Sequence, residues 1–79
     1  MMYIRIKIIG ANCSNGMKLS KMAERAVDEI EEEVTIEKIN DEKQKNRYGV
    51  KNIPALIIDE EVVSEGKVLT VREIKKLIA

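Results

Sequence analysis

Histidine, tryptophan and phenylalanine are absent from this chain of 79 residues, which has a single cysteine and a single proline. Without histidine no imidazole can act as a general acid or base, and one chain cannot assemble a zinc site from Cys and His ligands. A lone cysteine also excludes an internal disulfide. Polar chemistry is therefore restricted to Cys13, carboxylates, lysines, hydroxyl groups and the main chain.

An excess of charge of either sign is also missing. Lys and Arg together number 14, as do Asp and Glu, so the net charge is zero. This balance argues against a nucleic-acid partner. No apolar run approaches the roughly 20 residues of a membrane span, and we expect no membrane partner. The absence of a targeting signal and of a disulfide framework predicts a cytoplasmic protein.

The remaining composition is that of a folded protein, with 44% hydrophobic and 35% charged residues. The chain is about half the usual length of a domain, so we expect one domain over residues 1–79. We expect it to be a monomer or a weak dimer.

Apolar residues recur with the periods of alternating strands and helices. Ile4, Ile6 and Ile8 alternate with Arg5 and Lys7, which predicts a strand with one apolar face. The expected elements are a strand at 3–9, a helix at 14–32, a strand at 34–39, a short helix at 41–48, strands at 55–58 and 62–65, and a helix at 70–78. Thr70 and Glu73 have the spacing of a capping box for the last helix.

This β-α-β-α-β-β-α order predicts an α/β fold, with a mixed four-stranded sheet and helices on both faces. We expect the strand at 3–9 to lie inside the sheet, between the strands at 34–39 and 55–58. The helices at 14–32 and 70–78 should cover one face and the short helix the other.

Four segments of the sequence resemble one family, the small thioredoxin/glutaredoxin-like proteins known as redox-active disulfide proteins. They are Gly10–Leu19 (GANCSNGMKL), Tyr48–Val50 (YGV), Ile53–Asp59 (IPALIID) and Gly66. The resemblance extends over essentially the whole chain and is most specific from Tyr48 onward. It implies a thioredoxin-like fold.

The family's first helix starts with a Cys-x-x-Cys motif, whose second cysteine resolves the mixed disulfide formed by the first. In this sequence Gly16 stands at the second position. The resemblance implies that Cys13 is the catalytic residue. It also implies a set of substrate-binding residues, namely Ser14, Asn15, Gly16, Ile53 and Pro54. In the family this proline is cis and adjacent to the cysteine, and the residue before it binds substrate through its main chain.

The residues around Cys13 favour a reactive thiol independently of the resemblance. A helix N-terminus presents unpaired N–H groups and about half a positive charge, which stabilises a thiolate. Residues 1–23 contain Lys and Arg but no acidic residue, so this positive end is not already neutralised. The alternative for Cys13 is a buried, inert thiol.

Gly16 has two interpretations. It opens room beside the sulfur for a bulky partner, or it has drifted after the loss of a cysteine. In both cases a cysteine placed at position 16 should fit with little strain and form a disulfide with Cys13.

We interpret the chain as a monothiol-type thiol–disulfide oxidoreductase acting on a protein disulfide or small thiol. Cys13 forms a mixed disulfide, which an external thiol then resolves. This thiol is glutathione, another low-molecular-weight thiol or a reducing partner. We expect no metal and no bound cofactor. The alternative is a degenerate thioredoxin-fold binding module without redox turnover.

Two further functions fit the sequence less well. Copper handling of the ferredoxin-like type needs a second soft ligand and a β-α-β-β-α-β order. Iron–sulfur bridging by two chains and glutathione is typical of a Cys-Gly-Phe-Ser sequence, which this chain does not contain.

Overall fold

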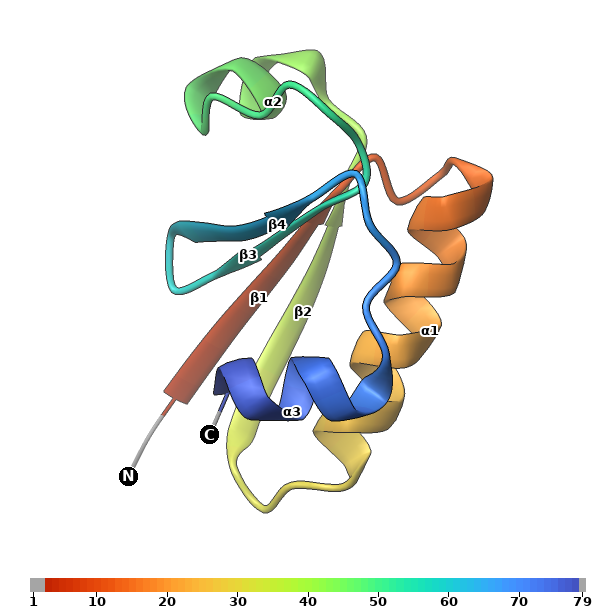
Figure 1. Ribbon diagram of the computed structural model, residues 1–79. Coiled ribbons are helices and arrows are strands. Elements are labelled where there is room, and N and C mark those ends of the chain that lie inside the picture. Colours follow the sequence, from red (N-terminus) through yellow and green to blue (C-terminus); the bar gives the residue numbers. More distant parts are fainter. Residues whose placement is uncertain (1–2, 79) are drawn as a thin grey trace.

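The computed structural model describes residues 3–78, and within them four strands form one sheet in the order β2-β1-β3-β4 (Figure 1). The strands are β1 (Tyr3–Ile9), β2 (Glu33–Ile39), β3 (Ala55–Ile58) and β4 (Glu61–Glu65), and the helices are α1 (Ser14–Asp28), α2 (Glu42–Arg47) and α3 (Val71–Ile78). β1 pairs parallel with β2 and antiparallel with β3, and β3 and β4 form a hairpin. The predicted α/β class and mixed sheet are confirmed, and the ferredoxin-like strand order is excluded.

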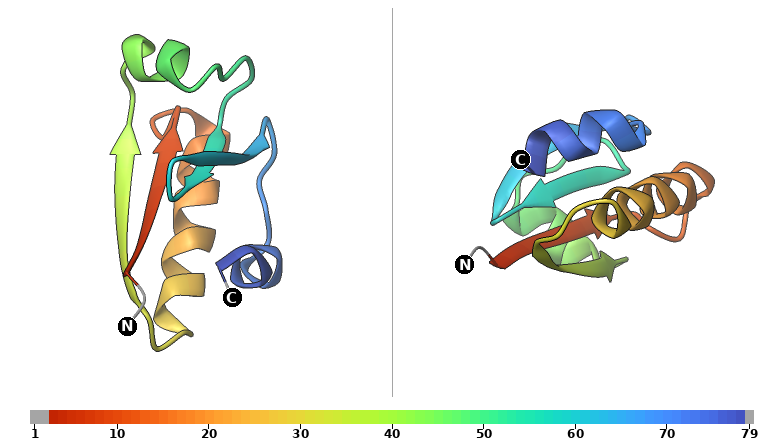
Figure 2. Two further views of the ribbon diagram at one scale, coloured as in Figure 1. Left: turned by 90° about the vertical axis from the view of Figure 1, so that its left-hand side faces the viewer. Right: turned by 90° about the horizontal axis from the view of Figure 1, so that it is seen from below.

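Helices α1 and α3 pack together on one face of this sheet (Figure 2). Ile4, Ile6 and Ile8 of β1 are at most 2% exposed beneath them. The residues that α1 and α3 contribute to this core are Leu19, Ala23, Ala26, Ile74 and Ile78. An ion pair of 2.9 Å between Lys75 and Glu29 also links α3 to the end of α1. The prediction that the two long helices share a face is confirmed.

The second face has a smaller apolar cluster, formed by Ile9, Ile39, Val50, Ala55 and Ile57. Helix α2 has no buried residue and lies beyond the carboxyl ends of β1 and β2 (Figure 1). Tyr48, which follows α2, packs against the cluster in its place. The short helix thus covers less of this face than predicted, because its sequence, EKQKNR, offers no apolar side chain.

The observed boundaries differ from the predicted ones mainly at the end of α1. This helix ends at Asp28 rather than at residue 32, and β2 already begins at Glu33. The acidic run at 31–33 would lie at the negative end of a longer helix, where carboxylates are unfavourable. No helix within residues 3–78 has the length and apolar character needed to cross a bilayer.

Candidate thiol site

Cys13 is the N-cap residue of α1, so its sulfur lies where the helix presents unpaired N–H groups. Its backbone is extended, with φ −75° and ψ 162°, and its Sγ accepts the Gly16 N–H at 3.2 Å. The thiol in turn donates to the Gly10 carbonyl at 2.9 Å. A thiolate would keep the bond from Gly16, and the first turn contains no acidic residue that would repel it.

The Cys13 side chain is half-buried and lines a cavity of about 280 Å³. The other residues that line this cavity are Ile9, Gly10, Asn12, Asn40, Asp41, Glu42, Lys45 and Ile53. The cavity brings Cys13 together with Ile53, a residue that is 44% exposed. The thiol is therefore open to a ligand rather than enclosed in the core.

The other residues expected at this site lie around the cavity but do not line it. Pro54 is joined to Ile53 by a cis peptide bond, and its ring is fully buried. Ser14 and Asn15 are exposed on the first turn of α1, whereas Gly16 is buried. Residues 51–54, which precede β3, are called the proline loop below. The part of this loop that is open to a ligand is Ile53.

The loop of residues 10–13, called the cysteine loop below, packs directly against the proline loop at Gly10. This residue has a φ of +79°, and a Cβ added to it would lie 2.7 Å from the Cβ of Ile53. Only glycine satisfies both the backbone conformation and the space at this point. The cysteine loop is also fixed to the end of β2, because the Asn12 N–H donates to Oδ1 of Asn40 at 2.8 Å.

The structure contradicts the expectation that a cysteine would fit at position 16. A Cβ added to Gly16 would lie 2.0 Å from the carbonyl oxygen of Gly10 and 2.8 Å from the Cα of Ala11. These are main-chain atoms, so the loop itself would have to move. Both interpretations made from the sequence are therefore incomplete: the absent side chain lets the cysteine loop approach α1, rather than making room for a partner.

The proline loop is held from the other side by Glu65, which the sequence did not indicate. Oε1 of Glu65 accepts the N–H groups of Lys51 at 2.8 Å and Asn52 at 3.2 Å. These two bonds lower the pKa of Glu65 below its ordinary value, and the bond from Lys51 has the larger effect. The contact depends on the register of the β3–β4 hairpin, in which Glu65 lies opposite Ala55, and no local motif indicates it.

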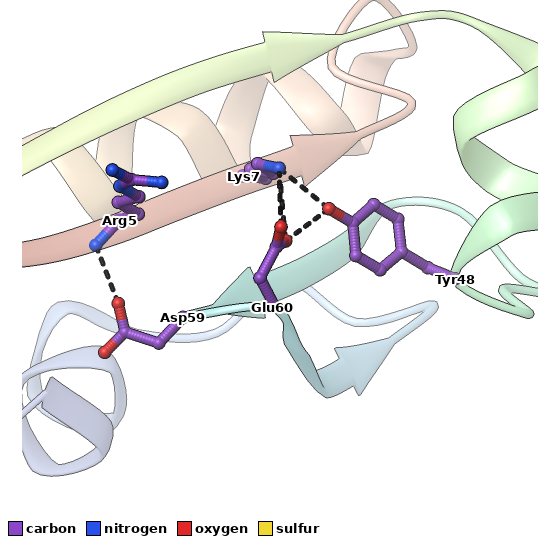
Figure 3. A network of polar contacts seen from close by, with 5 residues as sticks. All are labelled: Arg5, Lys7, Tyr48, Asp59 and Glu60. Atoms are coloured by element: carbon purple, nitrogen blue, oxygen red, sulfur yellow. Dashed lines mark hydrogen bonds and ion pairs between the residues drawn. The ribbon is translucent and has the colours of Figure 1, made fainter.

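Lys7, Tyr48 and Glu60 form a second polar cluster (Figure 3). None of these three residues lines the thiol cavity. Lys7 Nζ donates to the Tyr48 hydroxyl at 2.7 Å and pairs with Glu60 at 3.1 Å, while the hydroxyl donates to Glu60. These contacts raise the pKa of Lys7 and lower the pKa of Glu60. For both groups the hydrogen bond with Tyr48 is the largest cause, and the hydrogen bond between Lys7 and Glu60 is the second. This cluster links β1 to the turn of the hairpin, and the sequence analysis missed it.

Another hollow, of about 740 Å³, lies between β4 and α3. Its lining includes Ser64, whose Oγ is buried and has no partner among residues 3–78. None of the residues expected at the site lines this hollow. The charged residues of its lining, Glu65, Lys67, Glu73 and Lys76, are exposed, and it contains no thiol, so the cavity at Cys13 remains the candidate site.

A mixed sheet covered by two helices on one face, with a thiol capping the first helix, defines a thioredoxin-like redox protein. Residues 4–79 match the thioredoxin domain family, and the chain belongs to this family. It is also 34% identical over 76 residues to a thioredoxin of Methanothermobacter thermautotrophicus, an alignment that covers 96% of this chain and 99% of that protein. These findings confirm the family and the fold that the resemblance implied.

Proposed function

We propose that the protein catalyses thiol–disulfide exchange through Cys13 alone, and that an external thiol completes each cycle. The observation that carries this proposal is the position of the sulfur, which caps α1 by accepting the Gly16 N–H and at the same time lines an open cavity. A thiolate at this position is stabilised by the helix end and can be reached by a disulfide.

The reaction consists of two exchanges. The Cys13 thiolate attacks one sulfur of a substrate disulfide, so a Cys13–substrate disulfide forms and the second substrate sulfur leaves as a thiolate, which takes a proton from water. An external thiolate then attacks the substrate sulfur of the mixed disulfide and releases Cys13. The substrate is now joined to the external thiol by a disulfide. A second external thiolate attacks the external sulfur of this disulfide and releases the substrate as a thiol. Overall, two external thiols are oxidised to one disulfide and the substrate disulfide is reduced.

The need for an external thiol follows from Gly16. Position 16 would hold the resolving cysteine of a Cys-x-x-Cys motif, but the main chain of Gly10 and Ala11 occupies the space of any side chain there. Glutathione, another low-molecular-weight thiol or a reducing protein partner can take this role. Such thiols are kept reduced in the cytoplasm, where we place the protein.

The substrate-binding surface that we propose is formed by Ile53 and by the exposed start of α1 at Ser14 and Asn15. No hydrogen bond within residues 3–78 involves the main-chain N–H or C=O of Ile53. Both groups are therefore available to pair with an extended peptide, in the manner of a strand added to a sheet edge. The buried ring of Pro54 supports this loop from beneath. No metal or bound cofactor is required.

The test measures whether Cys13 exchanges with a small disulfide. Reduced protein is incubated with glutathione disulfide at neutral pH, quenched with acid and analysed by intact mass. We expect one glutathione adduct, which reduced glutathione removes, and no adduct on the Cys13→Ser variant. The adduct should form several-fold faster than on a short unstructured peptide of sequence Asn-Cys-Ser-Asn-Gly, because the peptide provides no helix end. A rate no faster than that of the peptide would favour the alternative, a binding module without redox turnover.

A further inference from the structure

We propose that Glu65 is a positioning residue for the peptide substrate, because its carboxylate fixes the main chain that leads into Ile53. This inference rests on the proposed function, since it concerns how a peptide is held beside Cys13. It assigns a role to a side chain that does not line the thiol cavity and does not touch the sulfur.

The geometry brackets Ile53 from both sides. Oε1 of Glu65 accepts the N–H groups of Lys51 and Asn52, the two residues before Ile53. The next residue of the chain, Gly66, donates its N–H to the Pro54 carbonyl at 2.8 Å. Glu65 and Gly66 thus form three hydrogen bonds to the main chain around Ile53.

This support matters because Lys51, Asn52 and Ile53 lie outside the strands of the sheet. β3 begins only at Ala55, and the side chains of Lys51, Asn52 and Ile53 are all exposed. Without the carboxylate, two N–H groups of the loop lose their acceptor, and nothing in the described structure replaces it. Ile53 packs against Gly10 of the cysteine loop, so a displaced proline loop changes how its main chain is presented beside Cys13.

The charge of Glu65 suits this role. A carboxylate oxygen can accept two N–H groups at once, and hydrogen bonds to an ionised acceptor are stronger than those between neutral groups. Glu61, at the other end of the same strand, is also exposed, and its carboxylate forms no hydrogen bond or ion pair among residues 3–78. It therefore provides a matched control for the loss of a carboxylate from β4.

The experiment compares two substrates, because the proposal concerns an extended peptide and not a small disulfide. The wild type, Glu65→Ala, Glu65→Gln and Glu61→Ala are assayed with a peptide disulfide and with glutathione disulfide, in the presence of reduced glutathione. We expect Glu65→Ala to lower kcat/KM for the peptide about tenfold, mainly through KM, since hydrogen bonds to a charged group are lost. The rate with glutathione disulfide should change little. Glu65→Gln retains an acceptor oxygen and should recover part of the loss, and Glu61→Ala should match the wild type.

Amide hydrogen exchange shows whether the variant acts through the loop. In Glu65→Ala we expect faster exchange at Lys51 and Asn52 but unchanged exchange at residues of the core such as Ile6. Equal losses with both substrates, or unchanged kcat/KM for the peptide, would overturn the proposal.

Failure of the proposed function would be seen separately. If the wild type exchanges with neither disulfide, the proposed exchange activity is refuted. The role of Glu65 is then tested by measuring peptide binding instead of activity. A peptide lacking cysteine is titrated into Cys13→Ser with and without Glu65→Ala and followed by NMR. Binding weakened about tenfold, corresponding to about 1.4 kcal/mol, supports the positioning role, and unchanged affinity overturns it.

Discussion

At the scale of single residues, the geometry of the sulfur depends on two glycines. Gly10 accepts the N–H and the thiol of Cys13 through its carbonyl, and Gly16 donates its N–H to the same sulfur. A side chain at Gly16 would collide with the Gly10 carbonyl. The absent Cβ therefore maintains the contacts that hold Cys13 at the helix end.

The first prediction concerns Gly16→Ala. Although alanine is the better helix former, its Cβ would lie 2.0 Å from the Gly10 oxygen, and we expect the collision to dominate. The free energy of unfolding should fall by about 1–3 kcal/mol, measured by urea denaturation. Asn15→Ala, an exposed substitution in the same turn, should change it by less than about 0.5 kcal/mol. A Gly16→Ala protein as stable as the wild type would show that the loop is not packed as described.

The second prediction reverses an expectation from the sequence. Gly16→Cys should be destabilised in the same way and should not form an internal 13–16 disulfide while the fold is retained, as measured by intact mass after mild oxidation. Quantitative formation of that disulfide in a stable protein would contradict this prediction.

The chemistry of the site was more predictable than its support. The start of a helix at Cys13 and the loop at Ile53 could be inferred from short segments and from the family resemblance. The clash at Gly16 and the bonds from Glu65 could not, because each depends on the position of main-chain atoms that only the folded structure defines. A sequence pattern contains periodicity and local motifs, but not the distance between two loops.

At the scale of elements, α3 shows a local motif that works as the sequence predicts. The Glu73 N–H donates to Oγ1 of Thr70 at 3.2 Å, and Oε1 of Glu73 accepts the Thr70 N–H at 3.0 Å. This capping box starts a helix of eight residues, which packs through Ile74 and Ile78 on the core beneath it. The cap therefore stabilises both the helix and its contact with α1.

The third prediction is that Thr70→Ala lowers the free energy of unfolding by about 0.5–2 kcal/mol, the usual contribution of an N-cap side chain. Arg72→Ala, an exposed substitution in the same turn, is the control and should have little effect. Urea denaturation of both variants measures the difference. An equal effect of the two substitutions would show that the cap does not stabilise the helix.

Strands were predicted more accurately than helix ends. The alternation of Ile4, Ile6 and Ile8 with charged residues defines β1 without ambiguity, and β3 was also predicted with its observed bounds. The amphipathic pattern of α1 continues past its true end, because Ile30 still packs against the core after the helix has stopped. The area of the second sheet face that α2 covers was overestimated, because this covering role was inferred from the expected fold and not from apolar residues in the helix.

At the scale of the whole molecule, ionised side chains link segments that are distant in sequence. Lys7 and Glu60 join β1 to the hairpin turn through Tyr48 (Figure 3). Glu65 joins the end of β4 to the proline loop. Glu73, by contrast, acts locally and contributes to the cap of α3. The stability of the fold should therefore depend on pH at both ends of the scale.

The fourth prediction gives the direction of that dependence. The pKa values of Glu60, Glu65 and Glu73 lie below the ordinary 4.5 in the folded protein, so the unfolded chain binds protons more readily. Their contribution is present above that value and is lost as the pH falls below it. The pKa of Lys7 lies above the ordinary 10.5, so its contribution is lost as the pH rises past that value. Urea denaturation across the pH range measures both losses.

Tyr48→Phe tests the cause of two of these shifts. The hydrogen bond with Tyr48 is the largest cause of the raised pKa of Lys7 and of the lowered pKa of Glu60. Removing the hydroxyl should therefore weaken the pH dependence of stability at the alkaline end and part of it at the acidic end. Tyr3→Phe, at an exposed tyrosine whose hydroxyl forms no hydrogen bond within residues 3–78, is the control. Identical pH profiles of the two variants would disagree with this assignment.

The central claim is that one thiol, Cys13, completes the cycle with the help of an external thiol. The most direct measurement follows the reduction of a peptide disulfide by glutathione, with samples quenched in acid and analysed by intact mass. We predict that a Cys13–peptide disulfide forms early and decays as glutathione is added, with many peptide disulfides reduced per protein molecule and none above background for Cys13→Ser. A wild-type protein that forms no such intermediate, or that reduces the peptide no faster than glutathione alone, would contradict the account.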